Sequence, residues 1–468
     1  MNRLVEILIR WTTRKYAFHS DIQKMYNAVR LDKTHWRFQM YLWDDELMME
    51  RVPRWKVIKT LIYGVRPSGN LAECGIRRTA ELCKSEFPKA YEVILNDMYV
   101  DDCLSEANTL KERLEVTDEV QVTLGKGGFS LKGFTFSGQD PPENVSSDQE
   151  SVVVGGLKWF PKGDFLKLNI GELNFNKKVR GRKVLGESGV IPEVHTKRDC
   201  ISKVSEVFDP IGRVAPLLGG LKLDICELHK NNLDWDDPIP NELKNVWAEN
   251  FDLIQEIGNI KFHRAIVPLD AVNLDVETID TADAGEKLVC AAIYARYKRR
   301  NGEYSSQLIF ARTKVVHGIT IPRAELVAAL LNARPGHIVR LSLGNWHKRC
   351  WKVTDSQVVL HWINSTKSSL KLWVRNRVIE ITRLVDRSAW RYVNRERMIA
   401  DLGTRKGAKI VDVTPDSPWI QGLPWMRYKE ANLPLKTADE IILSNQEMIE
   451  VNKQGVLDGC EEHRKNPC

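Results

Sequence analysis

Two adjacent carboxylates lie between apolar arms in the segment EVILNDMYVDDCLSE. Met98, Tyr99 and Val100 lead into Asp101 and Asp102. Neighbouring side chains of a straight strand point to opposite faces, but at the tip of a hairpin both can converge on one ion. A bound divalent cation explains most simply how two like charges stay ionised in a cleft. An exposed turn is the alternative, because Asp is a favoured turn residue.

A third carboxylate, Asp21, lies in the segment HSDIQKMYNAVRL. It precedes Ile22, Met25 and Val29, whose spacing is helical, so we expect Asp21 where a strand gives way to a turn or helix. Such element ends are where sites are commonly assembled. Three carboxylates suit Mg²⁺ and a two-metal arrangement that holds the attacking and leaving oxygens of a phosphoryl transfer.

A second group of acids occurs later in the chain, each at the predicted start or end of an element. Asp283 lies just before or within an opening strand, and Glu325 follows Pro322 in the first turns of a helix. Asp355 follows the strand-like RCWKV and precedes a helix, and Asp401 opens the last helical stretch. These four acids could converge at one end of a sheet if cations offset their repulsion. Each acid alone could instead be a helix cap or a surface charge.

The elements that must position these acids form four stretches of a 468-residue chain, which is long enough for two to four domains. Short apolar runs with Gly and Pro breaks predict mixed α/β structure to about residue 175. Helical spacing follows from 196 to 265, with Asn241 as a predicted N-cap. Strands and helices return from 270 to 408, including a hairpin about Asn301-Gly302. The polar remainder is expected to be a tail or linker.

Composition excludes several classes of protein. The chain has 43% hydrophobic and 28% charged residues and a net charge of +7, which is globular and compatible with a polyanionic partner. Its nine cysteines form no CxxC pair, so we expect reduced thiols. Cys460, His463 and Cys468 offer three ligands where a structural zinc site takes four. The sequence has no apolar run of about 18 residues, so neither a membrane span nor a signal peptide is predicted.

Several motifs of the first stretch resemble, in order, the palm motifs of reverse transcriptases from Pao/BEL long-terminal-repeat retrotransposons. They are DIQKMY (Asp21–Tyr26), YGVRPSGN (Tyr63–Asn70), YVDD (Tyr99–Asp102), GGFSLKGFTFSG and VVVGGLKWFPKGDFLKLN. The resemblance implies a pol polyprotein in which a polymerase palm is followed by further domains.

The resemblance also implies roles for individual palm residues. The metal ligands would be Asp21, Asp101 and Asp102. Tyr26 would disfavour a 2′-hydroxyl on the incoming nucleotide, and Gly64 and Ser68 would lie against the nucleotide or template. Because Asp21 lies close to residue 1, we expect the fingers to be largely missing and polymerase activity from this chain alone to be weak or absent.

The middle stretch resembles the thumb or connection of the same polyproteins. Its matching motifs are FDPIGRVAP (Phe208–Pro216) and LDWDDPIP (Leu233–Pro240). A thumb grips a duplex through phosphates rather than bases. The candidate phosphate contacts are Lys197, Arg198, Lys203 and Arg213, and for each of them solvated surface charge is the alternative.

The last group of acids resembles the four metal-binding positions of ribonuclease H. The matching segments are DAG at Asp283, AELVAAL at Glu325, TDSQVVLHWI at Asp355 and ADLGTRKG at Asp401. Asp280 is a nearby acid that ranks below Asp283. Met398 and Ile399 stand where Asn-Pro is common, which makes Asp401 the least typical of the four. Such enzymes hydrolyse the RNA strand of an RNA/DNA hybrid, using the 2′-hydroxyl to recognise RNA.

The sequence therefore predicts an α/β and α+β multidomain chain. The expected domains are a reverse transcriptase palm at 1–175, a thumb or connection at 176–268, a ribonuclease H-like domain at 269–410 and a tail or linker toward a missing downstream domain at 411–468. The implied cofactor is Mg²⁺, with Mn²⁺ as the alternative. The implied partners are an RNA template, a DNA primer, an RNA/DNA hybrid and dNTPs, in a cytoplasmic particle or the nucleus, and the sequence leaves the oligomeric state open.

Two other functions compete with this interpretation. A degenerate copy could fold and bind nucleic acid without catalysis. Families of this type also carry the label of Pao-type aspartic peptidase, whose chemistry requires an Asp-Thr-Gly or Asp-Ser-Gly loop. The nearest match, Asp280-Thr281-Ala282, lacks the glycine and overlaps the predicted nuclease strand.

Overall fold

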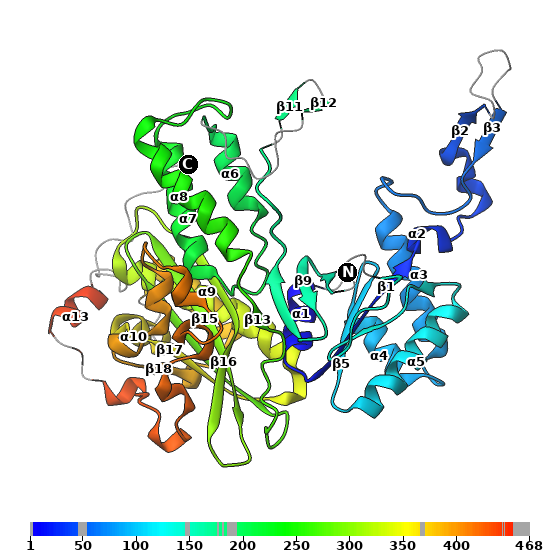
Figure 1. Ribbon diagram of the computed structural model, residues 1–468. Helices are drawn as coiled ribbons and strands as arrows, with labels where there is room; N and C mark the ends of the chain where they lie inside the picture. Colours follow the sequence, from blue (N-terminus) through cyan, green and yellow to red (C-terminus); the bar gives the residue numbers. More distant parts are fainter. Residues whose placement is uncertain are drawn as a thin grey trace. The chain divides into compact units, whose positions relative to one another are not determined.

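The computed structural model describes residues 3–44, 54–145, 150–175, 177–179, 182–184, 194–365, 370–441, 443 and 445–452. The chain divides into two compact units. Unit 1 comprises residues 1–155 and 159–164, and unit 2 comprises residues 156–158 and 165–468. Helices and several sheets alternate along the chain (Figure 1), so the predicted mixed α/β multidomain fold class is confirmed.

Unit 1 contains a sheet built around β1 (Tyr16–Gln23). This strand pairs antiparallel with β5 (Asp102–Ala107) on one side and with β6 (Ser130–Leu131) and β7 (Thr135–Phe136) on the other. The short strand β4 (Met98–Tyr99) forms a tight hairpin with β5. The predicted hairpin around the adjacent carboxylates is therefore present.

Helices of unit 1 pack on this sheet because their apolar residues recur at helical spacing. In α3, for example, Ala72, Ile76, Ala80 and Cys83 are buried. The other elements of unit 1 are α1 (Leu4–Thr12), α2 (Met25–Ala28), η1 (Lys33–Gln39), β2 (Met40–Trp43), β3 (Arg54–Val57), α3 (Ser68–Cys83), α4 (Pro88–Asn96), α5 (Leu110–Lys126) and β8 (Val152–Val154).

Unit 2 begins with short strands and continues with the predicted helical stretch. The strands that follow β8 are β9 (Leu157–Phe160), whose residues are divided between the two units, and β10 (Phe165–Leu168), β11 (Lys177–Val179), β12 (Arg182–Val184) and β13 (Phe262–His263) of unit 2. The helices are α6 (Lys197–Glu206), α7 (Ala215–Lys230) and α8 (Asn241–Ile257). Asn241 was predicted to cap α8, but Pro240 takes the cap position and Asn241 is the first helical residue. A Pro with extended backbone enforces the boundary sterically, without a side-chain cap.

A five-stranded mixed sheet forms the core of unit 2 and runs in the order β16-β15-β14-β17-β18. Its strands are β14 (Val276–Ala284), β15 (Leu288–Lys298), β16 (Tyr304–Val315), β17 (His347–Thr354) and β18 (Trp390–Tyr392). β14, β15 and β16 are antiparallel, whereas β17 is parallel to both β14 and β18. The predicted hairpin turn at Asn301-Gly302 is confirmed, and Gly302 there has a φ of 84°.

Helices α9 (Ile321–Leu343), α10 (Gln357–Asn364) and α11 (Leu372–Leu384) complete this fold. Buried apolar residues of these helices form one cluster with Trp390 of β18, and Trp362 and Trp390 are its largest members. Most of the strand β15 is buried on both faces, as expected for a strand in the interior of a covered sheet. The sheet edge that carries the acids is thereby held on a rigid support.

The FDPIGRVAP motif joins the helical stretch to the sheet of unit 2. The Asp209 carboxylate accepts hydrogen bonds from the backbone N–H groups of Gly212, Arg213 and Val214 at 2.8–3.0 Å. Ala311 of β16 donates its N–H to the carbonyl of residue 211 at 2.9 Å. Gly212 has a φ of 80°, and a Cβ there would collide with the Ala311 carbonyl. Glycine is therefore required at this crossing.

Residues beyond 411 were expected to form a tail or linker, yet their described part packs on unit 2. Trp419, Ile420, Trp425 and Met426 are buried. The Trp419 indole N–H donates to the carbonyl of Arg213 at 2.9 Å. The short elements of this part include α12 (Pro418–Gln421), η7 (Pro424–Arg427) and α13 (Asn445–Glu450). Cys460, His463 and Cys468 lie outside the described residues.

Among the described residues, no helix is long and apolar enough to cross a membrane.

Candidate functional site

Three of the predicted acids converge in unit 2 because of the strand order. β14 and β17 are parallel neighbours whose pairing ends at Ala282 and Thr354. Asp283 and Asp355 follow these positions and therefore emerge at the same edge of the sheet. Glu325 projects from the first turns of α9, which packs against β14.

The carboxylates of Asp283, Glu325 and Asp355 each place an oxygen within 4.8 Å of the other two. Asp283 and Glu325 are buried, and Asp355 is half-buried. Glu325 Oε2 and Asp355 Oδ1 are buried atoms without a hydrogen-bond partner among the described residues. Such orphaned buried oxygens are rare unless an ion or water meets them. An all-oxygen donor set fits a hard divalent cation such as Mg²⁺ or Mn²⁺.

The electrostatics of this triad are unfavourable for three bare carboxylates. Burial, followed by the charges of Asp283 and Asp355, raises the pKa of Glu325 well above its ordinary value. Burial and the charge of Asp283 raise the pKa of Asp355 to about 7. Burial also raises the pKa of Asp283, although the hydrogen bond from Thr404 opposes that shift. Buried acids with raised pKa values that share a cluster are typical of functional sites.

Asp401, the fourth predicted acid, lies beside this triad but is not part of it. It belongs to the 3₁₀ stretch η5 (Ile399–Gly403) rather than to an α-helix. The Arg405 guanidinium lies 2.5 Å from its carboxylate, and that of Arg395 lies 3.8 Å away. The negative charge of Asp401 contributes to the raised pKa values of Asp283 and Asp355.

Asp280, the neighbouring acid on β14, has a structural environment. Its carboxylate is 2.5 Å from the Lys352 ammonium, and both side chains are only 1% exposed. Lys352 also donates to the Asn332 side chain at 2.8 Å. A buried carboxylate that is paired in this way is held inside the sheet, and Asp283 rather than Asp280 reaches the triad.

The acids of unit 1 are brought together at the β1–β5 pair. Asp21 and Asp102 lie directly opposite each other in the antiparallel register, so their side chains share one face. Val100 takes a φ of 57° in the turn between β4 and β5. The carbonyl of Asp101 accepts a 2.9 Å hydrogen bond from Ile22 N–H, which holds the turn against β1. Burial, then the charges of Asp21 and Asp102, raise the pKa of Asp101.

Two basic side chains contact the carboxylates of unit 1. Lys132 Nζ lies 2.8 Å from Asp21 Oδ1. This hydrogen bond is the main cause of the raised pKa of the Lys132 ammonium. His19 Nε2 lies 3.0 Å from Asp102 Oδ1. Neither residue was predicted as part of a site, although Lys132 lies within the quoted motif GGFSLKGFTFSG. Asp21 and Asp102 thus have basic partners, whereas Glu325 and Asp355 of the unit 2 triad have orphaned oxygens.

Comparisons with known proteins bear on unit 2 most directly. Residues 196–356 match the family model described as "Pao retrotransposon-like RNaseH-like domain". This stretch is therefore similar to that family. The Pao/BEL resemblance is thus confirmed by an independent match, whose residues include Asp283, Glu325 and Asp355.

Two solved structures are similar to the chain as a whole. One is described as the foamy viral protease-reverse transcriptase in complex with RNA/DNA hybrid, with 15% identity and a TM-score of 0.49 over 91% of this chain and 49% of that one. The other is the foamy viral protease-reverse transcriptase dRH in complex with ds DNA, with 14% identity and a TM-score of 0.45 over 84% and 59% of the two chains. The chain therefore spans about half of the first structure's length. No curated protein matches the sequence.

The structure corrects the predicted phosphate contacts of the Pao-like domain. Lys197 and Lys203 are buried, and their ammonium groups donate to backbone carbonyls at 2.9 and 2.6 Å. Arg213 is also buried, which lowers its pKa to about 10. Arg198 alone of the four is exposed, and it pairs with Asp236 at 2.8 Å. Three of these four side chains hold the domain together and cannot reach a phosphate.

The predicted nucleotide contacts of unit 1 lie near the start of α3. The ring of Tyr26 packs edge-on against Tyr63 with centroids 4.7 Å apart. Gly64 takes a φ of 84° in the following turn, and Ser68 is the first residue of α3. Ser68 is buried, and its hydroxyl has no hydrogen-bond partner among the described residues. Tyr26 of α2 thus packs beside the turn that contains Gly64 and leads to Ser68, and the roles of these three residues remain predictions.

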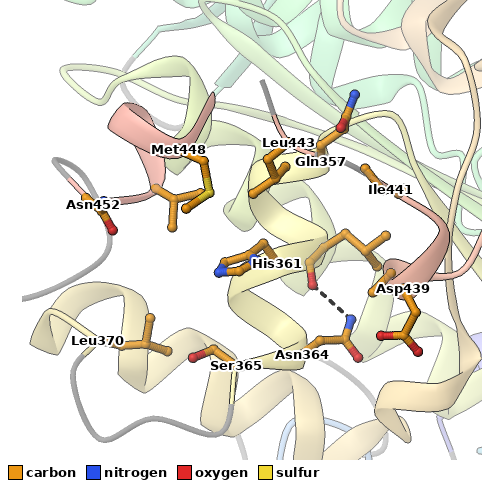
Figure 2. Close-up of a pocket in the computed structure, with 13 residues that line it drawn as sticks. Gln357, His361, Asn364, Ser365, Leu370, Asp439, Ile441, Leu443, Met448 and Asn452 are labelled. Carbon is orange, nitrogen blue, oxygen red and sulfur yellow. Dashed lines mark hydrogen bonds between the residues drawn. The ribbon is translucent and has the colours of Figure 1, made fainter. Parts of the chain in front are cut away.

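A cavity of about 460 Å³ lies between α10 and the described C-terminal segment (Figure 2). Its lining combines apolar groups such as Leu443 and Met448 with polar ones such as Gln357 and His361. One polar group is engaged locally, because Asn364 donates to the carbonyl of Leu360 at 2.9 Å. None of the predicted site residues lines this cavity.

Proposed function

We propose that the chain hydrolyses the RNA strand of an RNA/DNA hybrid at Asp283, Glu325 and Asp355. The observation that carries this proposal is the convergence of three carboxylates, two of which have orphaned buried oxygens. The match of residues 196–356 to an RNaseH-like domain supports the reaction class.

Mg²⁺, or alternatively Mn²⁺, would be held by Asp283, Glu325 and Asp355, with Asp401 at the rim. When bound, such cations activate water and stabilise the leaving oxygen of a phosphodiester. The chain's own contribution is to hold the acids in place. Thr404 donates a 2.6 Å hydrogen bond to Asp283 and fixes the orientation of that carboxylate. Glu325 is buried, so little water reaches its side chain.

Unit 1 supports a second candidate function, RNA-directed DNA synthesis. Here Asp21, Asp101 and Asp102 would hold metal ions, and the opposed register of Asp21 and Asp102 favours this role. Tyr26 would restrict the nucleotide's 2′ position, with Gly64 and Ser68 against the nucleotide or template. The partners would be an RNA template, a DNA primer and dNTPs.

The two competing functions receive less support. A catalytically inactive nucleic-acid-binding remnant would not need the orphaned oxygens of the triad. An aspartic peptidase would need an accessible Asp in a loop, whereas Asp280 is buried in β14 and paired with Lys352.

The test is cleavage of a hybrid whose RNA strand is labelled at its 5′ end, with Mg²⁺ or with chelator. Cleavage of the RNA strand is expected only with Mg²⁺, and Asp355→Asn should abolish it. Asp416→Asn is the matched control, because Asp416 is exposed and distant from the triad in sequence. Undiminished cleavage by Asp355→Asn would refute the assignment.

A further inference from the structure

A thiol and an imidazole meet in unit 2 although 91 residues separate them in the chain. Cys226 lies on α7, and His317 lies in the loop 316–320 between β16 and α9. Cys226 Sγ is 3.8 Å from His317 Nε2. Sulfur forms long, weak hydrogen bonds, so the imidazole is placed to accept the thiol proton. A cysteine beside a histidine is an arrangement that produces a reactive thiolate.

The pair lines a cavity of about 540 Å³. The walls of the cavity come from α7, from residues 285–287 between β14 and β15, from the loop 316–320 and from residues 404–406. Val316 N–H donates a 2.9 Å hydrogen bond to the Lys287 carbonyl, which holds the loop against the β14–β15 turn. Cys226 is half-buried and His317 is exposed. A small reagent can therefore reach the thiol.

Charged side chains around the cavity largely offset one another. The ion pairs there are Glu227 with Lys230, Asp224 with Lys406, and Asp401 with Arg405. Glu286 and Lys287, which are adjacent in the β14–β15 turn, also carry opposite charges. The feature that distinguishes Cys226 is therefore the imidazole of His317, and not an excess of positive charge.

Other cysteines of the described chain lack this combination of access and an imidazole. The buried ones are Cys83, Cys103, Cys200 and Cys290. Cys350 is half-buried, but its thiol donates to Asp280 at 3.5 Å, and burial raises its pKa to about 12. Cys74 is exposed and contacts no histidine within the part of the chain that the structure describes. Cys74 is thus an internal reference for an accessible thiol without an imidazole.

We propose that Cys226 is a modification site that forms mixed disulfides with small thiol compounds. The Cys226 sulfur attacks one sulfur of a low-molecular-weight disulfide, and its proton passes to His317 Nε2. An S–S bond to Cys226 forms as the S–S bond of the reagent breaks. The departing thiolate leaves with both electrons of the broken bond and takes up the proton. The disulfide is itself the oxidant, and a free thiol reverses the exchange.

The adduct would lie beside groups that support the proposed nuclease site. Gly285 and Thr404 line the same cavity as Cys226. Thr404 also donates the 2.6 Å hydrogen bond that orients Asp283. An adduct in the cavity should therefore slow cleavage of a hybrid, and this consequence rests on the proposed function.

The first test treats the native full chain with oxidised glutathione and maps the adducts by peptide mass spectrometry. Cys226 should react at least about tenfold faster than Cys74, because the rate of exchange follows the thiolate fraction. His317→Gln should remove this difference and leave the rate at Cys74 unchanged. His35→Gln, at an exposed histidine of unit 1, is the matched control. Equal rates at the two cysteines, or a wild-type rate at Cys226 in His317→Gln, would overturn the proposal.

The second test measures cleavage of a labelled hybrid before and after the same treatment. Cleavage by the wild-type chain should slow by about tenfold, as is typical when the partner of a metal ligand is disturbed, and dithiothreitol should restore it. Cys226→Ser should be insensitive to the treatment, whereas Cys74→Ser should respond like wild type. An equal response in Cys226→Ser would overturn the link between the adduct and cleavage. Mapping does not require cleavage, so an inactive untreated chain would refute the nuclease alone.

Discussion

The hydroxyl of Thr404 donates a 2.6 Å hydrogen bond to Oδ2 of Asp283, although 121 residues separate the two in the chain. The same hydroxyl lies 3.0 Å from the carbonyl of Asp401, so it ties the 3₁₀ stretch to the end of β14. Gly285 packs closely against the Thr404 backbone, which leaves this contact little freedom. Thr404 is therefore a positioning residue for the proposed nuclease site.

Replacing Thr404 with Val keeps its shape and removes the donor. The Mg²⁺ concentration for half-maximal cleavage should rise by about tenfold or more, as is typical when the partner of a metal ligand is lost. Thr404→Ser should restore the wild-type value. The control is Thr414→Val, because the Thr414 hydroxyl donates only to the nearby Val411 carbonyl. Equal Mg²⁺ dependence in Thr404→Val and wild type would show that the hydrogen bond positions nothing.

Divalent cations should stabilise the folded chain. Binding to the folded state alone at a hundred times the dissociation constant adds about 2.7 kcal/mol. Thermal melting should therefore shift upward with Mn²⁺ or Mg²⁺, and Glu325→Gln should lose most of the shift. The carboxylate-to-amide change Asp416→Asn is the control on the surface. A full shift in Glu325→Gln would place the cation elsewhere.

The Asp280–Lys352 pair should behave as a structural ion pair. Lys352→Met leaves a buried carboxylate without its partner, which typically costs about 3–5 kcal/mol. Adding Asp280→Asn should recover part of that loss, because the uncompensated charge is removed. Urea unfolding of both variants measures the difference. If the double variant is no more stable than the single one, the two groups are not coupled.

Lys132 should compete with cations for Asp21. In a chain whose unit 2 triad is neutralised by amide substitutions, Lys132→Met should strengthen Mn²⁺ binding by about tenfold, because an opposing positive charge is removed. Calorimetry or Mn²⁺ electron paramagnetic resonance measures the affinity. Lys126→Met, at an exposed lysine paired with Glu86, is the matched control. Weaker Mn²⁺ binding in Lys132→Met would contradict competition.

Buried His195 should make unit 2 sensitive to acid. It packs edge-on against Phe251 at 4.9 Å, and burial lowers its pKa from the ordinary value near 6.5. The neutral ring is favoured in the fold, so its stabilising contribution is present above pH 6.5 and is lost as the pH falls through the unfolded and then the folded pKa. The melting temperature of the wild-type chain should drop by a few degrees between pH 7 and 5.5. The drop should be smaller in His195→Phe. The exposed His229→Phe should retain the full drop.

Local patterns predicted that the acids of the unit 2 triad lie at element ends, and the resemblance to ribonuclease H implied that they share one site. Asp283, Glu325 and Asp355 each lie at an element end, and the strand order then brings those ends together. The sequence could not show that Asp401 is held by Arg405, because that depends on side-chain geometry within a 3₁₀ stretch.

Burial of long cationic side chains escaped prediction for a related reason. Lys197 and Lys203 look like surface charges in sequence, but their apolar stems pack inside while the ammonium groups reach backbone carbonyls. Trp419 was likewise placed in a tail, since nothing local reveals that its indole meets the Arg213 carbonyl 206 residues away.

The junction at Gly212 and Trp419 has a consequence for how this protein can be divided. In the loop between α6 and α7, the Ile211 carbonyl accepts a hydrogen bond from Ala311 N–H of β16, and the Arg213 carbonyl accepts one from the Trp419 indole, so this loop, the sheet and α12 belong to one cooperative structure. A cut near residue 268 would divide this folding unit, and the edge strand β16 of an excised nuclease would lose its contacts with Ile211 and Gly212. We expect recombination and proteolysis to leave this junction intact, so that helices α6–α8 and the five-stranded sheet are inherited as one unit.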